Sequence, residues 1–201
     1  MQDFYVQNGL FDRKHLLRLQ PETIEFEAND SIDNLFIQCR KVEVKAFKYY
    51  DERLQFDMFR VGTKFKISIQ KQDNTEFNVI FKGYFGKQKQ VFNVYNEIKN
   101  LLWNYYFYDV YLEKIELLNR QVEFEIPPLK FTATGIEFIS KNQKKTINFE
   151  NLSLKKYYTY FASFSKTNSD NYLLIDFKSN WNSAVSYEIL KTITNHINPQ
   201  Q

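Results

Sequence analysis

Few side chains able to do chemistry occur in this chain of 201 residues, and they are scattered along it. The two histidines, His15 and His196, stand near opposite ends, so we expect a surface or capping role for each rather than metal binding or proton transfer. The single cysteine, Cys39, excludes an intramolecular disulfide and a cysteine-based zinc cluster. We expect Cys39 to be a small apolar core residue rather than a nucleophile.

Repeated glutamates are the remaining candidates for acid–base chemistry. Glu25 recurs as Glu137, and Glu97 recurs as Glu188, each between apolar neighbours of a strand-like or helix-like pattern. We expect such positions to face solvent, where a carboxylate is ionised at neutral pH and is not suited to acid–base catalysis. The sequence contains no G-x-S-x-G, phosphate loop, H-E-x-x-H or EF-hand spacing. It therefore predicts a protein that is not an enzyme and that uses no cofactor and no metal.

Charge suggests weak contacts with acidic ligands at most. Lysine and arginine number 27 and aspartate and glutamate 24, a net charge of +3, and neither half of the chain is strongly basic. Binding of nucleic acid is therefore not the favoured explanation for the lysines and arginines. The tightest cluster, Lys141 with Lys144 and Lys145, reads as a solvated loop. Together with Arg18 and Lys130, which flank two predicted turns, these lysines are the candidate contacts to an acidic ligand.

Hydropathy favours a folded, soluble protein. Hydrophobic residues make up 43% of the chain, which is enough for real cores. The apolar runs fall short of the roughly 20 residues that a membrane helix needs. Met1 to Asp12 lacks the basic-then-apolar plan of a signal peptide, so we expect a cytoplasmic location.

An internal repeat becomes visible when two stretches are aligned without gaps. Residues 16–26 (LLRLQPETIEF) match 128–138 (PLKFTATGIEF), and the triplet Ile-Glu-Phe recurs at its end. A second block aligns 37–50 with 147–160, which sets Cys39 against Phe149. Further pairs follow in the same order: Phe81 and Lys82 with Phe177 and Lys178, then Val94, Glu97 and Ile98 with Val185, Glu188 and Ile189. The chain is therefore predicted to contain two copies of one domain.

The apolar period within each copy predicts strands first and a helix last. Period-two alternation predicts hairpins around 17–26, 42–46, 65–81 and, in the second copy, 129–138, 152–154 and 160–177. Extra material at 51–62 is predicted to lengthen a strand pair. Spacing of three to four over 91–105 and 185–197 predicts a closing helix for each copy. Residues 106–120 are predicted to form a helical connector, because no Gly or Pro interrupts 87–126.

The second copy resembles the pleckstrin-homology (PH) superfold, in particular its bacterial variety. The resemblance rests on a T-x-x-G-I turn followed by an I-x-F-x-x-L segment and a C-terminal helix. The residues on which the resemblance depends are Thr132, Gly135, Ile136, Phe138, Ile147, Phe149 and Leu152. The resemblance implies an α+β fold of two antiparallel curled sheets or partly open barrels, each closed by a C-terminal helix. The expected domains are 8–105 and 121–201, on either side of the connector.

Aromatic residues are too many for two small cores to hide easily, with 20 Phe, 14 Tyr and 2 Trp. Some are expected in a surface that binds a protein partner, and the candidates lie around the connector: Trp103, Tyr105, Tyr106, Tyr108 and Tyr111. Purely structural use of these rings and base stacking remain as alternatives. We therefore expect a non-enzymatic protein-interaction or scaffolding module, with a partner of unknown identity or a second copy. The alternative is a peripheral membrane adaptor that binds acidic lipid headgroups through scattered Lys and Arg.

Overall fold

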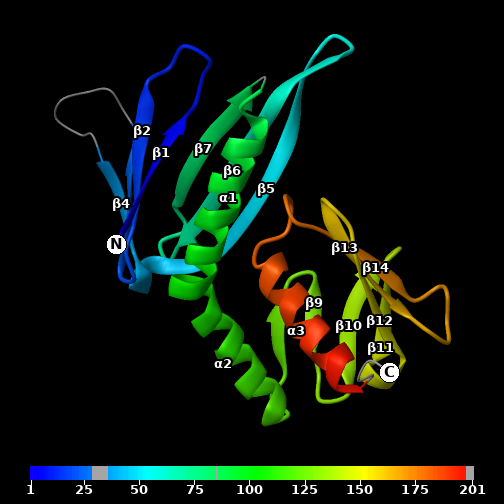
Figure 1. The fold of residues 1–201 in the computed structure, drawn as a ribbon. Helices are drawn as coiled ribbons and strands as arrows, with labels where there is room; N and C mark the ends of the chain where they lie inside the picture. The colour runs from blue at the N-terminus through cyan, green and yellow to red at the C-terminus, as the bar shows by residue number, and fades with distance from the viewer. Residues whose placement is uncertain (29–35, 85, 198–201) are drawn as a thin grey trace. The chain divides into compact units, whose positions relative to one another are not determined.

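The computed structural model describes residues 1–28, 36–84 and 86–197 (Figure 1). These residues form an α+β protein with four antiparallel sheets and few helices, which confirms the α+β part of the predicted fold class. The chain divides into two compact units, Met1–Tyr108 and Asp109–Gln201. We call them the first unit and the second unit and describe each by itself.

The first unit begins with a sheet in the order β1-β2-β3-β4. These strands are β1 (Gln2–Gln7), β2 (Lys14–Leu19), β3 (Thr23–Glu27) and β4 (Phe36–Arg40). A short 3-10 helix, Lys41–Glu43, leads into a sheet in the order β5-β6-β7. Its strands are β5 (Val44–Phe56), β6 (Phe59–Lys71) and β7 (Glu76–Tyr84). The hairpin β5–β6 spans the extra residues 51–62, as predicted, and is interrupted by a β-bulge between Leu54 and Gln55.

Alternating burial explains why β2 and β3 form where the sequence predicted them. Leu17, Leu19, Ile24 and Phe26 are all buried, and the residues between them are only partly buried. The Gln20 N–H donates to the carbonyl of Thr23 at 2.9 Å and closes the turn. By contrast, β1 precedes residue 8, where the first domain was predicted to begin. This strand was not recognised because it is short and buries only Phe4 and Val6.

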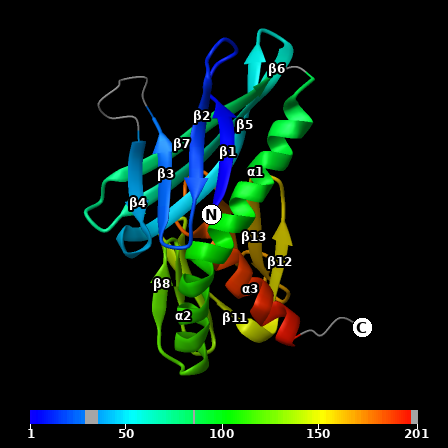
Figure 2. The same cartoon turned by 60° about the vertical axis from the view of Figure 1, so that its left-hand side comes forward.

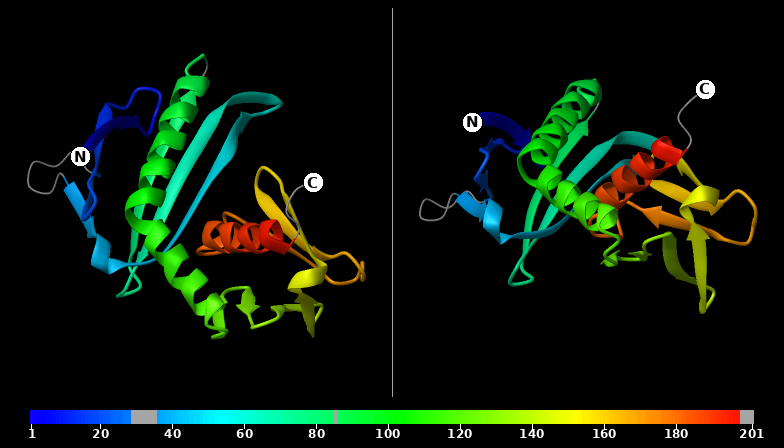
Figure 3. Two further views of the ribbon diagram at one scale, coloured as in Figure 1. Left: turned by 60° about the horizontal axis from the view of Figure 1, so that its bottom comes forward. Right: turned by 90° about the horizontal axis from the view of Figure 1, so that it is seen from below.

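The helix of the first unit is α1 (Gln88–Leu102), which contacts β6 and β7. In the left panel of Figure 3 it lies between the two sheets of this unit. Its buried stripe consists of Tyr95, Ile98 and Leu102. A π-helical turn, Trp103–Phe107, follows directly, and α2 (Tyr108–Asn119) continues the helical segment into the second unit. The predicted connector is therefore helical from residue 106 to Asn119.

The second unit has its elements in the same order. Its first sheet is β8 (Phe124–Ile126), β9 (Leu129–Phe131), β10 (Gly135–Ser140) and β11 (Gln143–Asn148), each paired with the next. A 3-10 helix, Phe149–Asn151, precedes the sheet of β12 (Leu152–Lys156), β13 (Tyr160–Ser165) and β14 (Tyr172–Asp176). The chain then forms α3 (Ser183–Ile197), which lies against β12 in Figure 2. Its buried residues include Val185, Ile189 and Ile193, as the spacing predicted.

One part of the predicted internal alignment is wrong. Cys39 is paired with Ile24, and the residue that occupies the same place opposite Ile136 in the second unit is Ile147, not Phe149. The two 3-10 helices agree with this correction: the N–H of Lys41 donates to Glu22, and the N–H of Phe149 donates to Thr134. The correct alignment of residues 37–50 with the second unit therefore differs by two residues. Two residues are one strand period, so the shift preserves the apolar alternation.

Candidate functional site

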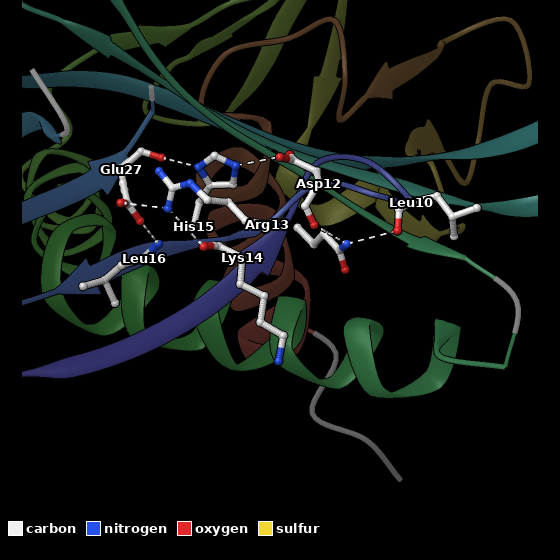
Figure 4. Close-up of polar contacts among 8 residues, drawn as sticks. Leu10, Asp12, Arg13, Lys14, His15, Leu16 and Glu27 are labelled. Atoms are coloured by element: carbon white, nitrogen blue, oxygen red, sulfur yellow. Dashed lines mark hydrogen bonds and ion pairs between the residues drawn. The ribbon is translucent and has the colours of Figure 1, made fainter. Parts of the chain in front are cut away.

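His15 lies at the centre of a polar cluster beside the loop between β1 and β2 (Figure 4). Its side chain is buried, and Nδ1 donates to the backbone carbonyl of Glu27 at 2.9 Å. Nε2 lies 3.2 Å from Oδ2 of Asp12. Because both ring nitrogens are engaged, neither is available as a base or a metal ligand. Of the surface or capping role expected for each histidine, His15 agrees only with capping, since it is buried and bonds to the Glu27 carbonyl. His196 is exposed in the last turn of α3, as expected.

The carboxylate of Glu27 holds the same loop region from the other side (Figure 4). Oε2 accepts the backbone N–H of Leu16 at 3.0 Å, and Oε1 accepts from the Arg13 guanidinium at 2.9 Å. The bond from Leu16, assisted by Arg13, lowers the pKa of Glu27. These contacts fix the end of β3 against the start of β2.

Cys39 is fully buried in β4, as the sequence predicted. Burial raises the pKa of its thiol, which keeps the sulfur protonated. Since the thiolate is the nucleophile, this cysteine is inert in the folded unit. In the described residues, no group of three His, Cys, Asp or Glu side chains could hold a metal ion.

The predicted aromatic residues of the first unit have different environments. Tyr106 is buried, and its hydroxyl donates to the carbonyl of Gln20, so its side chain is not available to a partner of the folded unit. Burial also raises the pKa of Tyr106. Trp103 and Tyr105 are half-buried, and Tyr108 is exposed. In the second unit, Tyr111 is half-buried, with its hydroxyl 2.9 Å from that of Thr192 on α3.

The cations predicted to meet an acidic ligand mostly have carboxylate partners. Arg18 bonds to Asp3 at 3.0 Å and to Glu25 at 3.2 Å, and the bond to Asp3 raises the pKa of Arg18. Lys130 lies 2.6 Å from Glu123, which raises the pKa of that lysine. Each carboxylate offsets the attraction of its cation for an external anion.

The remaining predicted cations lie around β11. Lys144 lies 2.9 Å from the carboxylate of Glu137. Lys145 donates to the backbone carbonyl of Asp170. Lys141 is exposed in the β10–β11 turn, where it and Asn142 both have positive φ, as a tight two-residue hairpin turn requires. The expected loop position is thus correct for Lys141, but Lys144 and Lys145 belong to a strand.

A cavity of about 280 Å³ in the first unit is the feature that sequence reasoning missed. It lies between β1, the end of β7 and the start of α1, and the lysines in its lining are Lys14, Lys82 and Lys87. Tyr5 and Tyr84 add aromatic surface. Lys14 lies on β2, Lys82 on β7 and Lys87 just before α1, so no local spacing in the sequence could have joined Lys14 to the other two. A second cavity, in the second unit, is lined by lysines and glutamates alike and has no clear preference for one charge.

Two groups of large apolar side chains are exposed, one in each unit. The tip of the β5–β6 hairpin presents Phe56, Met58 and Phe59, which are 76%, 90% and 74% exposed. In the second unit, Phe164 of β13 lies directly opposite Tyr172 of β14, and Leu174 is the next residue on the same face. Those three side chains are 36%, 46% and 55% exposed. We call Phe164, Tyr172 and Leu174 the β13–β14 face.

No protein-family model matches this chain, and no curated protein matches it in sequence. The helices among residues 1–28, 36–84 and 86–197 are all too short or too polar to cross a membrane.

Proposed function

We propose that the two units are PH-like domains in tandem, each a pair of curled sheets closed by its C-terminal helix. The order of elements supports this proposal, because each unit has four strands, a 3-10 helix, three strands and a helix of 15 residues. Equivalent hairpins also share their register, since Leu19 pairs with Ile24 as Phe131 pairs with Ile136. A repeated register in a repeated order favours duplication of one domain.

The function we propose is that of a non-enzymatic protein-interaction module that binds by strand addition at β14. The observation that carries this proposal is the open edge of β14 beside the β13–β14 face. In the described part of the second unit, β14 is hydrogen-bonded to β13 on one side only. Unpaired backbone groups bordered by exposed aromatic and aliphatic side chains are what an added strand needs.

Charge distinguishes this edge from the others in its unit. The edge strands β11 and β12 each carry two lysines, and lysine on an edge discourages pairing with another chain. Edge strand β8 has only three residues. The sequence of β14, Tyr-Leu-Leu-Ile-Asp, has no cation and one carboxylate at its end. Of these four edge strands, β14 is therefore the least protected against pairing with another chain.

A second copy of the chain is the partner that β14 itself fits. In an antiparallel pair centred on Leu174, Tyr172 faces Asp176 of the second copy, and Leu173 faces Ile175 of the second copy. The apolar residues then match, and each tyrosine hydroxyl reaches toward a carboxylate. Such a pairing is two-fold symmetric and closes at a dimer.

Replacing Leu174 with lysine tests this proposal. We expect wild-type protein to show a concentration-dependent monomer–dimer equilibrium in sedimentation velocity. Leu174→Lys should raise the dimer Kd by at least about tenfold, because the pairing would bury a charge against apolar neighbours.

The matched control is Ile139→Lys, which changes an exposed apolar residue of the central strand β10 in the same way. It should leave the dimer Kd unchanged. A wild-type protein that stays monomeric at its highest soluble concentration, or an equal effect of both substitutions, would contradict pairing through β14.

The β5–β6 tip supports a second candidate, a peripheral membrane adaptor. Three large apolar side chains at the end of a long hairpin can enter the headgroup boundary of a bilayer, where their apolar surface leaves water. The double substitution Phe56→Ser and Phe59→Ser is then expected to weaken vesicle binding by more than about tenfold. Vesicle flotation measures this, with Ile139→Ser as control. Vesicle binding that is the same in both variants would reject this candidate.

A further inference from the structure

The three lysines of the first-unit cavity have no acidic partner among the described residues. Elsewhere in the first unit, Arg13, Arg18 and Lys64 each lie within 3.4 Å of a glutamate oxygen. Among the described residues, no carboxylate lines the cavity, and none pairs with its lysines. The cavity therefore gathers positive charge that the surrounding protein does not neutralise.

The local packing places the end of β7 beside the N-terminus of α1. Lys87 immediately precedes α1, whose first turn contains no acidic residue and whose N-terminus receives no bond from a capping side chain. The positive end of the helix therefore adds to the field of the lysines. Gly83 allows β7 to approach this helix, since a Cβ there would lie only 3.1 Å from Cβ of Val91. Close packing at Gly83 thus brings the end of β7 next to the start of α1.

We propose that this cavity binds a phosphate monoester attached to a small apolar group. A dianion is attracted by lysines that no carboxylate neutralises, and lysine is a common phosphate ligand. The apolar part of the ligand would contact Tyr5, Tyr84 and Val94, which also line the cavity. A volume of about 280 Å³ suits a small ester. This inference goes beyond the proposed function, because it concerns a different unit and a different ligand.

Calorimetric titration of the full chain with phenyl phosphate at low salt tests the proposal. We expect saturable binding of one equivalent, with weaker binding of inorganic phosphate and none of phenol. Substitution of Lys14, Lys82 and Lys87 by glutamine should weaken binding by about tenfold for each lysine removed. The single variant Lys87→Gln gives the same test if the triple variant folds poorly.

The matched control is the triple glutamine variant of Lys141, Lys144 and Lys145, the cluster that the sequence alone suggested. It removes the same charge from the second unit and should bind phenyl phosphate as wild type does. Absence of saturable binding, or equal losses in the two triple variants, would overturn the proposal, since equal losses would indicate attraction to net charge alone.

Vesicles distinguish a lipid from a soluble source of the phosphate monoester. Phosphatidic acid presents this group at a membrane surface. Flotation with vesicles of phosphatidylcholine that contain phosphatidic acid, lost in the Lys87→Gln variant and competed by phenyl phosphate, would assign the lipid headgroup. Binding of phenyl phosphate without such flotation would assign a soluble ester.

Discussion

Replacement of Phe107 with alanine is expected to lower the free energy of unfolding of the first unit by about 3–5 kcal/mol. Phe107 is fully buried at the end of the π-helical turn, and its ring stacks on that of Phe47 in β5, with 8° between the ring planes. Alanine removes both the apolar surface and the stacking partner of Phe47. It leaves a cavity that strand β5 and the helix cannot close without moving.

Urea denaturation followed by circular dichroism measures this loss, and amide hydrogen exchange locates it. The control is Phe92→Ala, which removes the same side chain from a partly exposed position on α1. We expect the control to cost about 1 kcal/mol. Equal losses for the two variants, or a loss of amide protection confined to the second unit, would contradict the role of Phe107 in the core of the first.

The position of Phe107 shows what helical spacing alone could and could not predict. The stripe through Tyr95, Ile98 and Leu102 was correct, and it predicted that Tyr105 would follow. The π-helical turn over Trp103–Phe107 adds a residue to the turn and rotates the stripe. Tyr106 and Phe107 therefore face the core, and Tyr105 is only half-buried. A π-helical turn has no clear composition signal in an aromatic-rich segment, so this shift could not be foreseen.

Strand prediction succeeded where turns and alternation agreed. The hairpins β2–β3 and β9–β10 have turn residues between their strands and buried apolar residues at period two. The alignment error at Cys39 arose because apolar alternation alone does not fix the register of a strand pair. A two-residue slip keeps every apolar residue on its face, so only the hydrogen-bond register opposite Ile24 and Ile136 exposes it.

Candidate sites were harder to predict than strands, because they depend on contacts between distant segments. His15 is buried only because Asp12 and the carbonyl of Glu27 face its two nitrogens. Lys82 and Lys87 lie close in sequence, but Lys14 joins them only through the fold of the first unit. The lysines at 144 and 145 cluster in sequence, yet adjacent strand residues point to opposite faces. Sequence clustering was therefore a poor guide to charge clustering.

Gly135, the single glycine in the sequence of residues 109–201, is expected to be sensitive to substitution. It begins β10, where the side chain of Thr132 accepts its N–H at 3.1 Å and where it pairs with Asn148. A Cβ at this position would overlap the backbone carbonyl oxygen of Ile147 and lie 3.0 Å from Cα of Asn148. Both obstacles are backbone atoms of β11, so the strand pair itself must separate. This explains why the T-x-x-G turn requires glycine here.

Gly135→Ala should therefore lower the free energy of unfolding of the second unit by about 2–3 kcal/mol. Urea denaturation measures the loss, and amide exchange should show the first loss of protection in β10 and β11. The control is Gly9→Ala, where the nearest atom to a new Cβ is the side-chain Cβ of Asp12 at 3.3 Å in a loop. Because a loop can shift by a few tenths of an ångström, we expect that substitution to cost less than about 1 kcal/mol. Wild-type stability of Gly135→Ala would contradict this close approach of the β11 backbone to Gly135.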